Sequence, residues 1–318
     1  NTGKERTAVC CLSSLNIEKY DEWKDDTMFI EDVMRFLDNV MSDFINRAPD
    51  SFSNAKYSAM RERSVGLGVM GLHSFFQQKN IPFGSVMSKV WNQKIFKLIQ
   101  EKADQASVKL AEERGSCPDA EEYGIKERFS NKTAIAPTAS ISVICGGASP
   151  GIEPIAANSY THKTLSGSFN VRNKYLAKIL EKHGKNNDET WSSITTNQGS
   201  VSHLNFLTDI EKDTFKTAFE IDQRWIVELG ADRTPNVSQA QSINVFVPAD
   251  IHKKDLHQIH FQAWKKGLKS LYYCRSKSIQ RAENVNTGSS TDVTKNVYKA
   301  NKESTNEENK YEECLSCQ

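Results

Sequence analysis

The spacing of apolar residues along the chain predicts two long amphipathic helices. Apolar side chains recur three and four positions apart over residues 30–45 and again over residues 95–110, as they do on the buried face of a helix. The first helix is predicted to end near Pro49 and the second at Gly115, because both residue types commonly follow a helix. Shorter helices are predicted over residues 172–183 and 209–229, the second of them stopped by Gly230.

Short runs rich in apolar and β-branched residues lie between these helices and predict strands. They cover residues 7–17, 133–136, 141–145, 242–247 and 268–273. Strands separated by long helical stretches favour an α/β architecture in which the strands pair in parallel. We therefore predict one α/β domain over residues 1–275.

The composition changes from about residue 275 onward. Asn, Ser, Thr, Lys and Glu dominate residues 276–318, so this segment is predicted to be a disordered tail. Over the whole chain, 41 Lys and Arg nearly balance 40 Asp and Glu, which argues against binding a nucleic-acid backbone by bulk charge. No stretch reaches the roughly 20 apolar residues that span a bilayer, and no secretory signal pattern opens the sequence, so we expect a cytoplasmic protein with no membrane partner.

The chain has seven cysteines, and an odd number without a signal peptide argues against a secreted disulfide scaffold. Cys314 and Cys317 form a Cys-x-x-Cys pair in the predicted tail. No histidine lies beside them, and His252, His257 and His260 are interpreted as ordinary helix residues, so no metal site is expected. No helix follows the pair, as a thioredoxin-type site would require. We interpret it as a mobile dithiol that exchanges with a disulfide elsewhere; two incidental cysteines are the alternative.

Gly66, Gly68 and Gly71 match the G-x-G-x-x-G pattern, which would indicate a nicotinamide-dependent oxidoreductase. That pattern is informative only directly after a strand, at the start of a helix and about 20 residues before a carboxylate. Here the preceding residues 56–64 are charged, and residues 83–85 contain no carboxylate. The glycines are therefore interpreted as a site of close backbone packing, at a point where a helix meets the rest of the domain.

Three hydroxyl side chains, those of Thr138, Ser140 and Ser142, closely follow the predicted strand over residues 133–136. A strand followed by a turn of Thr and Ser is an arrangement in which backbone N–H groups and hydroxyls bind an anion. The turn is thus a candidate diphosphate-binding site, and an ordinary polar loop is the alternative.

Tyr272 and Tyr273 are adjacent at the end of the last predicted strand. Neighbouring side chains on a regular strand point to opposite faces, so two tyrosines that touch would require a bend or a strand end, which Cys274 and Arg275 could supply. A phenol can lose an electron and a proton together, which suits one-electron transfer. Ordinary packing of both rings is the alternative.

The order of these features resembles that in the large, catalytic subunit of class I aerobic ribonucleotide reductases, over essentially the whole chain. The matching motifs are Ala8-Val9-Cys10-x-Leu12-Ser13-Ser14, Gly66-x-Gly68-Val69-x-Gly71, Pro137-Thr138-Ala139-Ser140, Gly151-Ile152-Glu153-Pro154, Leu271-Tyr272-Tyr273 and Glu313-Cys314-x-x-Cys317. The resemblance implies the C-terminal half of a ten-stranded α/β barrel, followed by the tail.

The resemblance also implies what the substrate is and which residues act on it. The family reduces ribonucleoside diphosphates to 2′-deoxyribonucleoside diphosphates by thiyl-radical chemistry, for DNA synthesis. Cys10 matches one member of the pair of cysteines that supplies the electrons, and Cys11 occupies a variable position and is interpreted as a packed thiol. The residues that match the turn holding the diphosphate are Pro137, Thr138, Ala139, Ser140 and Ile141.

Two further pairs match residues that carry electrons in the family. Tyr272 and Tyr273 match the stacked pair that relays a radical from a metal-containing small subunit. Cys314 and Cys317 match the tail dithiol that re-reduces the active-site disulfide and is itself reduced by thioredoxin or glutaredoxin. The resemblance implies no cofactor bound by this chain.

One expected element is missing from the sequence. The family's finger loop, with the pattern Asn-x-Cys-x-Glu, does not occur, and only nine residues precede Cys10, upstream of which it lies in the family. We therefore expect half of an active site, inactive alone, that needs a chain carrying the upstream half as well as the small subunit. A split gene or a processed longer chain would fit. A redox-regulated interaction module and an inactive reductase relic are the alternative hypotheses.

Overall fold

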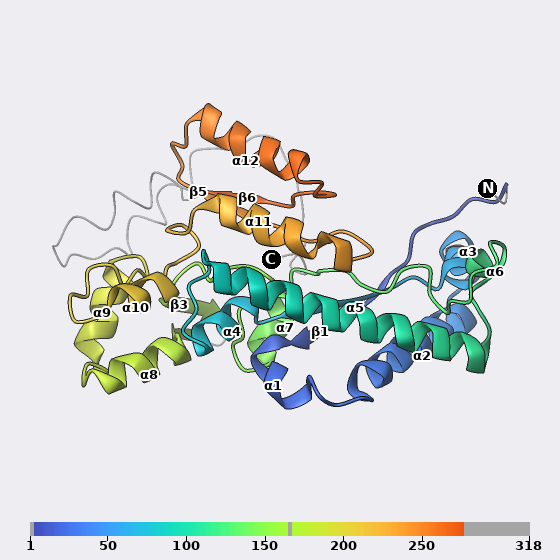
Figure 1. Ribbon diagram of the computed structural model, residues 1–318, viewed down its shortest axis with the longest axis horizontal. Coiled ribbons are helices and arrows are strands. Elements are labelled where there is room, and N and C mark those ends of the chain that lie inside the picture. Colours follow the sequence, from blue (N-terminus) through green and yellow to red (C-terminus); the bar gives the residue numbers. More distant parts are fainter. Residues whose placement is uncertain (1–2, 165–166, 277–318) are drawn as a thin grey trace, which may run out of the picture.

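A computed structural model describes residues 3–164 and 167–276, and the predicted tail dithiol of Cys314 and Cys317 lies outside these residues. Helices alternate with short strands along the described chain (Figure 1). The strands are β1 (Cys11–Asn16), β2 (Val65–Met70), β3 (Ser159–Thr164), β4 (Gly167–Arg172), β5 (Val245–Val247) and β6 (Cys274–Ser276). The helices are α1 (Tyr20–Trp23), α2 (Phe29–Arg47), α3 (Ser53–Glu62), α4 (Leu72–Gln78), α5 (Val86–Arg114), α6 (Pro118–Glu121), α7 (Ala139–Ile144), α8 (Lys174–Lys182), α9 (Asp188–Thr196), α10 (Asp209–Thr214), α11 (Gln223–Arg233) and α12 (Lys253–Lys265). Single 3-10 turns lie at Ile17–Lys19, Asp50–Phe52 and Thr234–Asn236.

The short strands join into one run of parallel segments. β1 and β2 pair in parallel along their whole length. Parallel bridges continue the run from Leu67 to Thr133 and from Ile135 to Gln241, and β5 pairs in parallel with β6. Neighbouring segments are joined through helices, so their order across the run is their order along the chain. The predicted α/β architecture with parallel pairing is confirmed, and β3 and β4 form a separate antiparallel hairpin.

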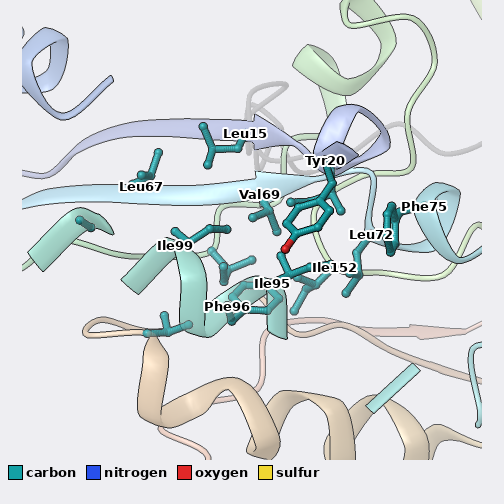
Figure 2. Close-up of a cluster of buried hydrophobic side chains, with 14 of the residues drawn as sticks. Leu15, Tyr20, Leu67, Val69, Leu72, Phe75, Ile95, Phe96, Ile99 and Ile152 are labelled. Atoms are coloured by element: carbon teal, nitrogen blue, oxygen red, sulfur yellow. The ribbon is translucent and has the colours of Figure 1, made fainter. Parts of the chain in front are cut away.

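The main hydrophobic core lies between this run and the long helix α5. Figure 2 shows Leu67 and Val69 of β2 in the same cluster as Ile95, Phe96 and Ile99 of α5. All five side chains are at most 2% exposed, which is the burial expected of a strand covered by a helix. Helix α5 also packs against α2 and α11, so it joins an early and a late part of the chain (Figure 1).

Two smaller clusters of buried side chains lie apart from the main core. The first joins helices α8 and α9 to the segments on either side of α10. It is made of Tyr175, Leu176, Leu180, Trp191, Ile194, Val201, Leu204, Leu207 and Phe215. The second packs α11 and α12 against β5, and its members are Val227, Val245, Val247, Ile259 and Ala263. Among the described residues, no helix is long and apolar enough to cross a membrane.

The helices with strong periodicity are where the sequence places them. Helix α2 ends at Arg47 and α5 ends at Arg114, next to Gly115, whose φ of +85° favours glycine. Helix α8 lies within the range predicted for the shorter helix over residues 172–183. In each case one face of the helix is buried, so the apolar spacing reflects real packing.

The single helix predicted over residues 209–229 is wrong. The segment forms two helices, α10 and α11, because Asp222 begins a new helix by accepting a hydrogen bond from the Arg224 N–H at 3.0 Å. Gly230 does not stop α11 but lies inside it. A Cβ there would come within 2.9 Å of the Ile243 side chain, so the glycine permits close packing instead.

Two of the predicted strands are also wrong. Residues 141–145 mostly form α7, because Thr138 adopts a left-handed conformation (φ 58°) and its C=O accepts the N–H of Ser142 at 3.0 Å, which starts a helix. Local helix geometry here overrides the strand preference of Ile141 and Val143. The strand predicted over residues 268–273 begins only at Cys274.

Candidate active site

Cys10 lies immediately before β1, where the run of parallel segments begins. Its side chain is exposed, and the Gln239 Nε2 atom donates to the Cys10 Sγ at 3.2 Å. The same Nε2 group also donates to the Val65 carbonyl at 2.9 Å, which fixes the amide against β2. Cys11 packs partly buried against the main core, and burial raises the pKa of its thiol. The two adjacent cysteines therefore differ in access: the first can react at the surface and the second is packed.

The glycine motif forms part of the surroundings of Cys10. Gly66 and Gly68 lie inside β2, and both face Ala134 of the neighbouring segment. A Cβ on Gly66 would lie 3.1 Å from the Cys10 Sγ, and a Cβ on Gly68 would lie 2.2 Å from the Ala134 carbonyl oxygen. The glycines allow two backbones to approach and leave room for the thiol. Close packing is therefore present, but it lies between two neighbouring strand segments and not where a helix meets the rest of the domain, as the sequence interpretation had it.

The predicted anion turn lies between the bridged segment at Ile135 and helix α7. Thr138 is buried, and its Oγ1 accepts a hydrogen bond from the Gly151 N–H at 2.6 Å. The Ser142 hydroxyl donates to the Ala139 carbonyl at 3.2 Å, while Ser140 is exposed. Two of the three hydroxyls thus have partners within the protein. The remaining donors of the turn are the Ser140 hydroxyl and the first main-chain N–H groups of α7.

The main-chain N–H groups at the start of α7 lack partners within the helix because of helix geometry. The first N–H groups of an α-helix have no acceptor within the helix, and the first main-chain bond at α7 runs from Ser142 to Thr138. The N–H groups of Ala139, Ser140 and Ile141 precede it. The backbone at Gly151 packs closely against the start of the turn, since a Cβ there would lie 3.1 Å from the Ala136 carbonyl oxygen. The motif that contains Gly151 therefore supports the turn.

Tyr272 and Tyr273 are in contact with each other. Their ring centroids are 4.1 Å apart with an interplanar angle of 53°, and the two residues are 41% and 44% exposed. The guanidinium of Arg275 lies 5.7 Å from the centre of the Tyr273 ring. Cys274 and Arg275 do not supply the expected bend, because both belong to strand β6. The two rings are therefore in contact, and the cause of the contact must lie at the tyrosines themselves.

The sequence motif at Gly151 contributes a buried carboxyl group that was not predicted as a site residue. Glu153 is 7% exposed, and its Oε1 accepts a hydrogen bond from the Asn244 Nδ2 at 2.5 Å. Burial raises the pKa of Glu153 to about 7, and the charge of Arg275 and the bond from Asn244 act in the opposite direction. Only the residue's place in the Gly151-Ile152-Glu153-Pro154 motif could have pointed to it.

The predicted residues therefore form separate groups along the run of segments. The structure brings the two tyrosines together, in the last segment, and sets Cys10 beside Gln239 at the start of the first. The histidines of α12 have local contacts: the His252 Nδ1 caps the helix by accepting the Lys254 N–H, and His257 stacks on Phe261.

Comparison with known proteins agrees with this arrangement. A family model described as "Ribonucleotide reductase, barrel domain" matches residues 1–127 and 119–274. The ribonucleoside-diphosphate reductase large subunit of Invertebrate iridescent virus 6 is 50% identical over 290 residues, which cover 90% of this chain and 30% of that protein. The corresponding subunit of Invertebrate iridescent virus 3 is 43% identical over 293 residues, which cover 91% and 46%.

A solved structure also matches the described fold. The alpha subunit of the class Id ribonucleotide reductase of Actinobacillus ureae superposes with a TM-score of 0.80 at 40% identity, covering 86% of this chain and 51% of that one. This chain thus spans about half or less of the length of the relatives that it matches. The matched family model covers nearly all of the described residues, and the chain belongs to the ribonucleotide reductase family, as part of its barrel domain.

Proposed function

We propose that this chain is part of the large subunit of a ribonucleoside-diphosphate reductase and supplies one portion of its active site. The observation that carries the proposal is the contact between Tyr272 and Tyr273, whose ring centroids are 4.1 Å apart. Consecutive side chains on a regular strand would point to opposite faces and would not touch. Both rings are partly exposed, so an oxidant on another protein can approach them. A pair built only for packing would be expected to be buried.

The tyrosines relay an oxidising equivalent from a metal-containing small subunit. A phenol that gives up an electron and a proton becomes a neutral radical, and a second phenol in contact can reduce it in turn. The pair therefore passes the radical on without accumulating charge. The cysteine that finally receives it belongs to an Asn-x-Cys-x-Glu loop in the family, a pattern that these 318 residues do not contain. We assign that loop to sequence outside this chain.

Cys10 is one of two thiols that reduce the substrate. Replacement of the 2′-hydroxyl of a ribonucleoside diphosphate by hydrogen, with release of water, consumes two electrons and two protons. Two thiols supply them and become a disulfide. Cys10 is suited to this role because its side chain is exposed and held by Gln239, whereas Cys11 is packed against the core.

The turn at α7 holds the diphosphate of the substrate. The N–H groups of Ala139, Ser140 and Ile141 are directed away from the helix and can donate to phosphate oxygens. Thr138 holds the start of α7 against Gly151, and Pro137 restricts the backbone before it. The turn carries no charged side chain between residues 137 and 142, which suits a substrate that must leave after each turnover.

The dithiol of Cys314 and Cys317 restores the reduced state. A thiolate of this pair attacks the disulfide that contains Cys10, and a second exchange leaves Cys314 and Cys317 joined to each other. Thioredoxin or glutaredoxin then reduces that disulfide. The complete enzyme on this proposal consists of this chain, the upstream part of the large subunit, and the small subunit.

The proposal is tested by assaying reduction of a ribonucleoside diphosphate in the assembled mixture of this chain, a polypeptide carrying the upstream half, a small subunit and a dithiol. We expect turnover to fall to background with Tyr272→Phe, Tyr273→Phe or Cys10→Ser, while the free energy of unfolding stays unchanged. Tyr123→Phe is the matched control, because Tyr123 is 80% exposed and lies in another part of the fold. Full activity of the Tyr272 and Tyr273 variants would overturn the relay.

A further inference from the structure

The hydrogen bonds beside the tyrosines are irregular in a specific way. The Tyr272 N–H donates to the Ile243 carbonyl at 2.8 Å, and the Tyr273 carbonyl accepts the Val245 N–H at 2.9 Å. In a regular parallel pair, a single residue would both donate to residue 243 and accept from residue 245. Here two residues share these bonds, so one extra residue has been inserted opposite Asn244. The tyrosines form a β-bulge in the segment that leads into β6.

The bulge explains why the two rings meet. Successive side chains alternate between the two faces of a regular strand, which would send Tyr272 and Tyr273 in opposite directions. An inserted residue breaks the alternation locally and bends the strand. The regular register resumes at once, with Val245 opposite Cys274. The irregularity is therefore confined to the pair.

A bulge leaves one main-chain N–H without its acceptor in the ladder, and here that group is the N–H of Tyr273. The side chain of Asn244 takes the place of the missing acceptor, with its Oδ1 accepting from the Tyr273 N–H at 2.9 Å. Asn244 is 1% exposed, so water cannot readily substitute for it. A hydrophobic side chain at this position would leave the N–H without a partner.

The other end of the Asn244 amide is also fixed. Its Nδ2 donates to the Oε1 of Glu153 at 2.5 Å, and Glu153 is itself 7% exposed. An amide held at both ends cannot rotate to present its NH₂ group to Tyr273. Glu153 accepts through Oε1 whether its carboxyl group is protonated or ionised, so the orientation does not depend on its charge.

We propose that Asn244, oriented by Glu153, is a positioning residue that maintains the bulge and thereby keeps the rings of Tyr272 and Tyr273 in contact. The structural part of this proposal stands on the hydrogen bonds alone. Its catalytic consequence rests on the proposed function, because contact between the rings matters for turnover only if the pair relays a radical. Neither residue touches the reacting atoms; both act through the tyrosines.

The structural part is tested by amide hydrogen exchange in the full chain labelled with 15N-tyrosine, with the Tyr273 signal assigned by its loss in Tyr273→Phe. We expect Asn244→Leu to speed exchange of the Tyr273 N–H by about 10-fold or more, the effect of losing one hydrogen bond. The matched control is Asn92→Leu. Asn92 is also buried and bonded at both ends, to the Leu229 carbonyl and to Arg233, so it reports general destabilisation.

The role of Glu153 is tested with two substitutions at one position. Glu153→Gln retains an acceptor oxygen and should leave exchange of the Tyr273 N–H close to that of the unaltered chain. Glu153→Leu removes the acceptor and should resemble Asn244→Leu. If Asn244→Leu does not fold, the comparison of the two Glu153 variants tests the same hydrogen bond. Equal exchange in both Glu153 variants, or Asn244→Leu matching Asn92→Leu, would overturn the proposal.

The catalytic consequence is tested in the assembled enzyme. We expect Asn244→Leu and Glu153→Leu to lower kcat by about 10- to 100-fold, the scale expected when reacting groups are displaced by about 1 Å, with KM unchanged. Glu153→Gln should restore most of kcat. Faster exchange of the Tyr273 N–H with an unaltered kcat would overturn the positioning role. Full activity of Tyr272→Phe and Tyr273→Phe would instead refute the relay, and the exchange result would still decide the structural part.

Discussion

Replacing Gly68 by alanine would place a methyl group against the backbone of the neighbouring segment. The added Cβ would lie 2.2 Å from the Ala134 carbonyl oxygen, about 1.2 Å short of ordinary van der Waals contact. Gly66, two residues earlier on β2, offers a matched comparison. There the nearest atom, at 2.5 Å, is the Leu12 Cδ2, which is the far end of a side chain of a residue 54% exposed. One substitution thus meets fixed backbone and the other meets a side chain that can rotate away.

The expected free energies of unfolding follow from this difference. Neither glycine has a positive φ, so alanine can adopt both backbone conformations and should gain about 0.4–1 kcal/mol from the lower entropy of the unfolded chain. Overpacking costs about 1–3 kcal/mol, and more where backbone must shift. We expect Gly68→Ala to lose about 3 kcal/mol and Gly66→Ala about 1 kcal/mol or less. At Gly66 the Leu12 side chain and the Cys10 thiol can move, and of the three nearest atoms only the buried Ala134 methyl, at 2.9 Å, is fixed to the backbone.

The assay is equilibrium unfolding of the full chain in urea. With a slope of about 3 kcal/mol per molar, a loss of 3 kcal/mol lowers the midpoint by about 1 M, and a loss of 1 kcal/mol lowers it by about 0.3 M. Equal midpoints for the two variants would refute the reasoning. They would mean that the Ala134 backbone moves away from an added methyl group as easily as the Leu12 side chain does. Gly66→Ala should also displace the Cys10 thiol, which lies 3.1 Å from the added Cβ.

Three further predictions concern charged and reactive side chains. Asp38 is fully buried and pairs with three arginines, including Arg63 at 2.6 Å. Asp38→Ala should therefore lower the free energy of unfolding, measured in urea, by about 3–5 kcal/mol, because it leaves buried positive charge without a partner. A decrease below about 1 kcal/mol would contradict the importance of the pairing. The pKa of Glu153 is raised from 4.5 to about 7, so between these pH values the folded chain binds a proton that the unfolded chain has lost. The free energy of unfolding should therefore fall by about 3 kcal/mol as the pH rises from 4.5 to 7. Glu153→Gln should reduce this pH dependence, which would be absent if the carboxyl group were solvated. Cys117 is fully buried, and burial raises the pKa of its thiol, whereas Cys10 is exposed. A thiol-specific reagent should therefore label Cys10 in the folded chain and Cys117 only after unfolding. Equal labelling rates for the two cysteines would refute this difference.

The features predicted correctly from the sequence are those with local signals. The two long helices were found because their buried faces repeat every three or four residues, and each end carries a recognisable residue such as Gly115. The parallel α/β arrangement follows from alternation of helices and strands. The close packing at Gly66 and Gly68 was inferred because charged residues precede the motif and no carboxylate follows it, and the structure shows the atoms that the glycines approach. The sequence did not reveal that the motif lies in strand β2 and at the turn into helix α4.

The errors arise where a hydrogen bond decides between local alternatives that the apolar pattern does not distinguish. Residues 141–145 have strand-forming side chains, yet the left-handed Thr138 and its bond to Gly151 direct the chain into a helix. The break between α10 and α11 depends on the capping bond of Asp222, which competed with a continuous apolar pattern. The first bond joins residues 13 positions apart and the second joins residues two positions apart, and neither follows from the period of the apolar residues.

The surroundings of the tyrosines were the least predictable part of the site. The sequence shows that two adjacent tyrosines need a distortion in order to touch, but the distortion was expected at Cys274. The partners that stabilise it are separated by 91 positions along the chain, between Glu153 and Asn244. No spacing rule connects a buried carboxyl group with an amide at such a separation.

The bond between Gln239 and Cys10 joins residues 229 positions apart, which has a consequence for biosynthesis. At about 5–20 residues per second, a ribosome needs roughly 10–50 s to extend the chain from one to the other. Contacts of such high sequence separation also form late in folding, since a large loop must first be closed. The nascent chain therefore carries the Cys10 thiol without its amide partner throughout that interval. The thiol is exposed from the start, and it acquires the fixed position seen beside Gln239 only when the last strand segments have been made.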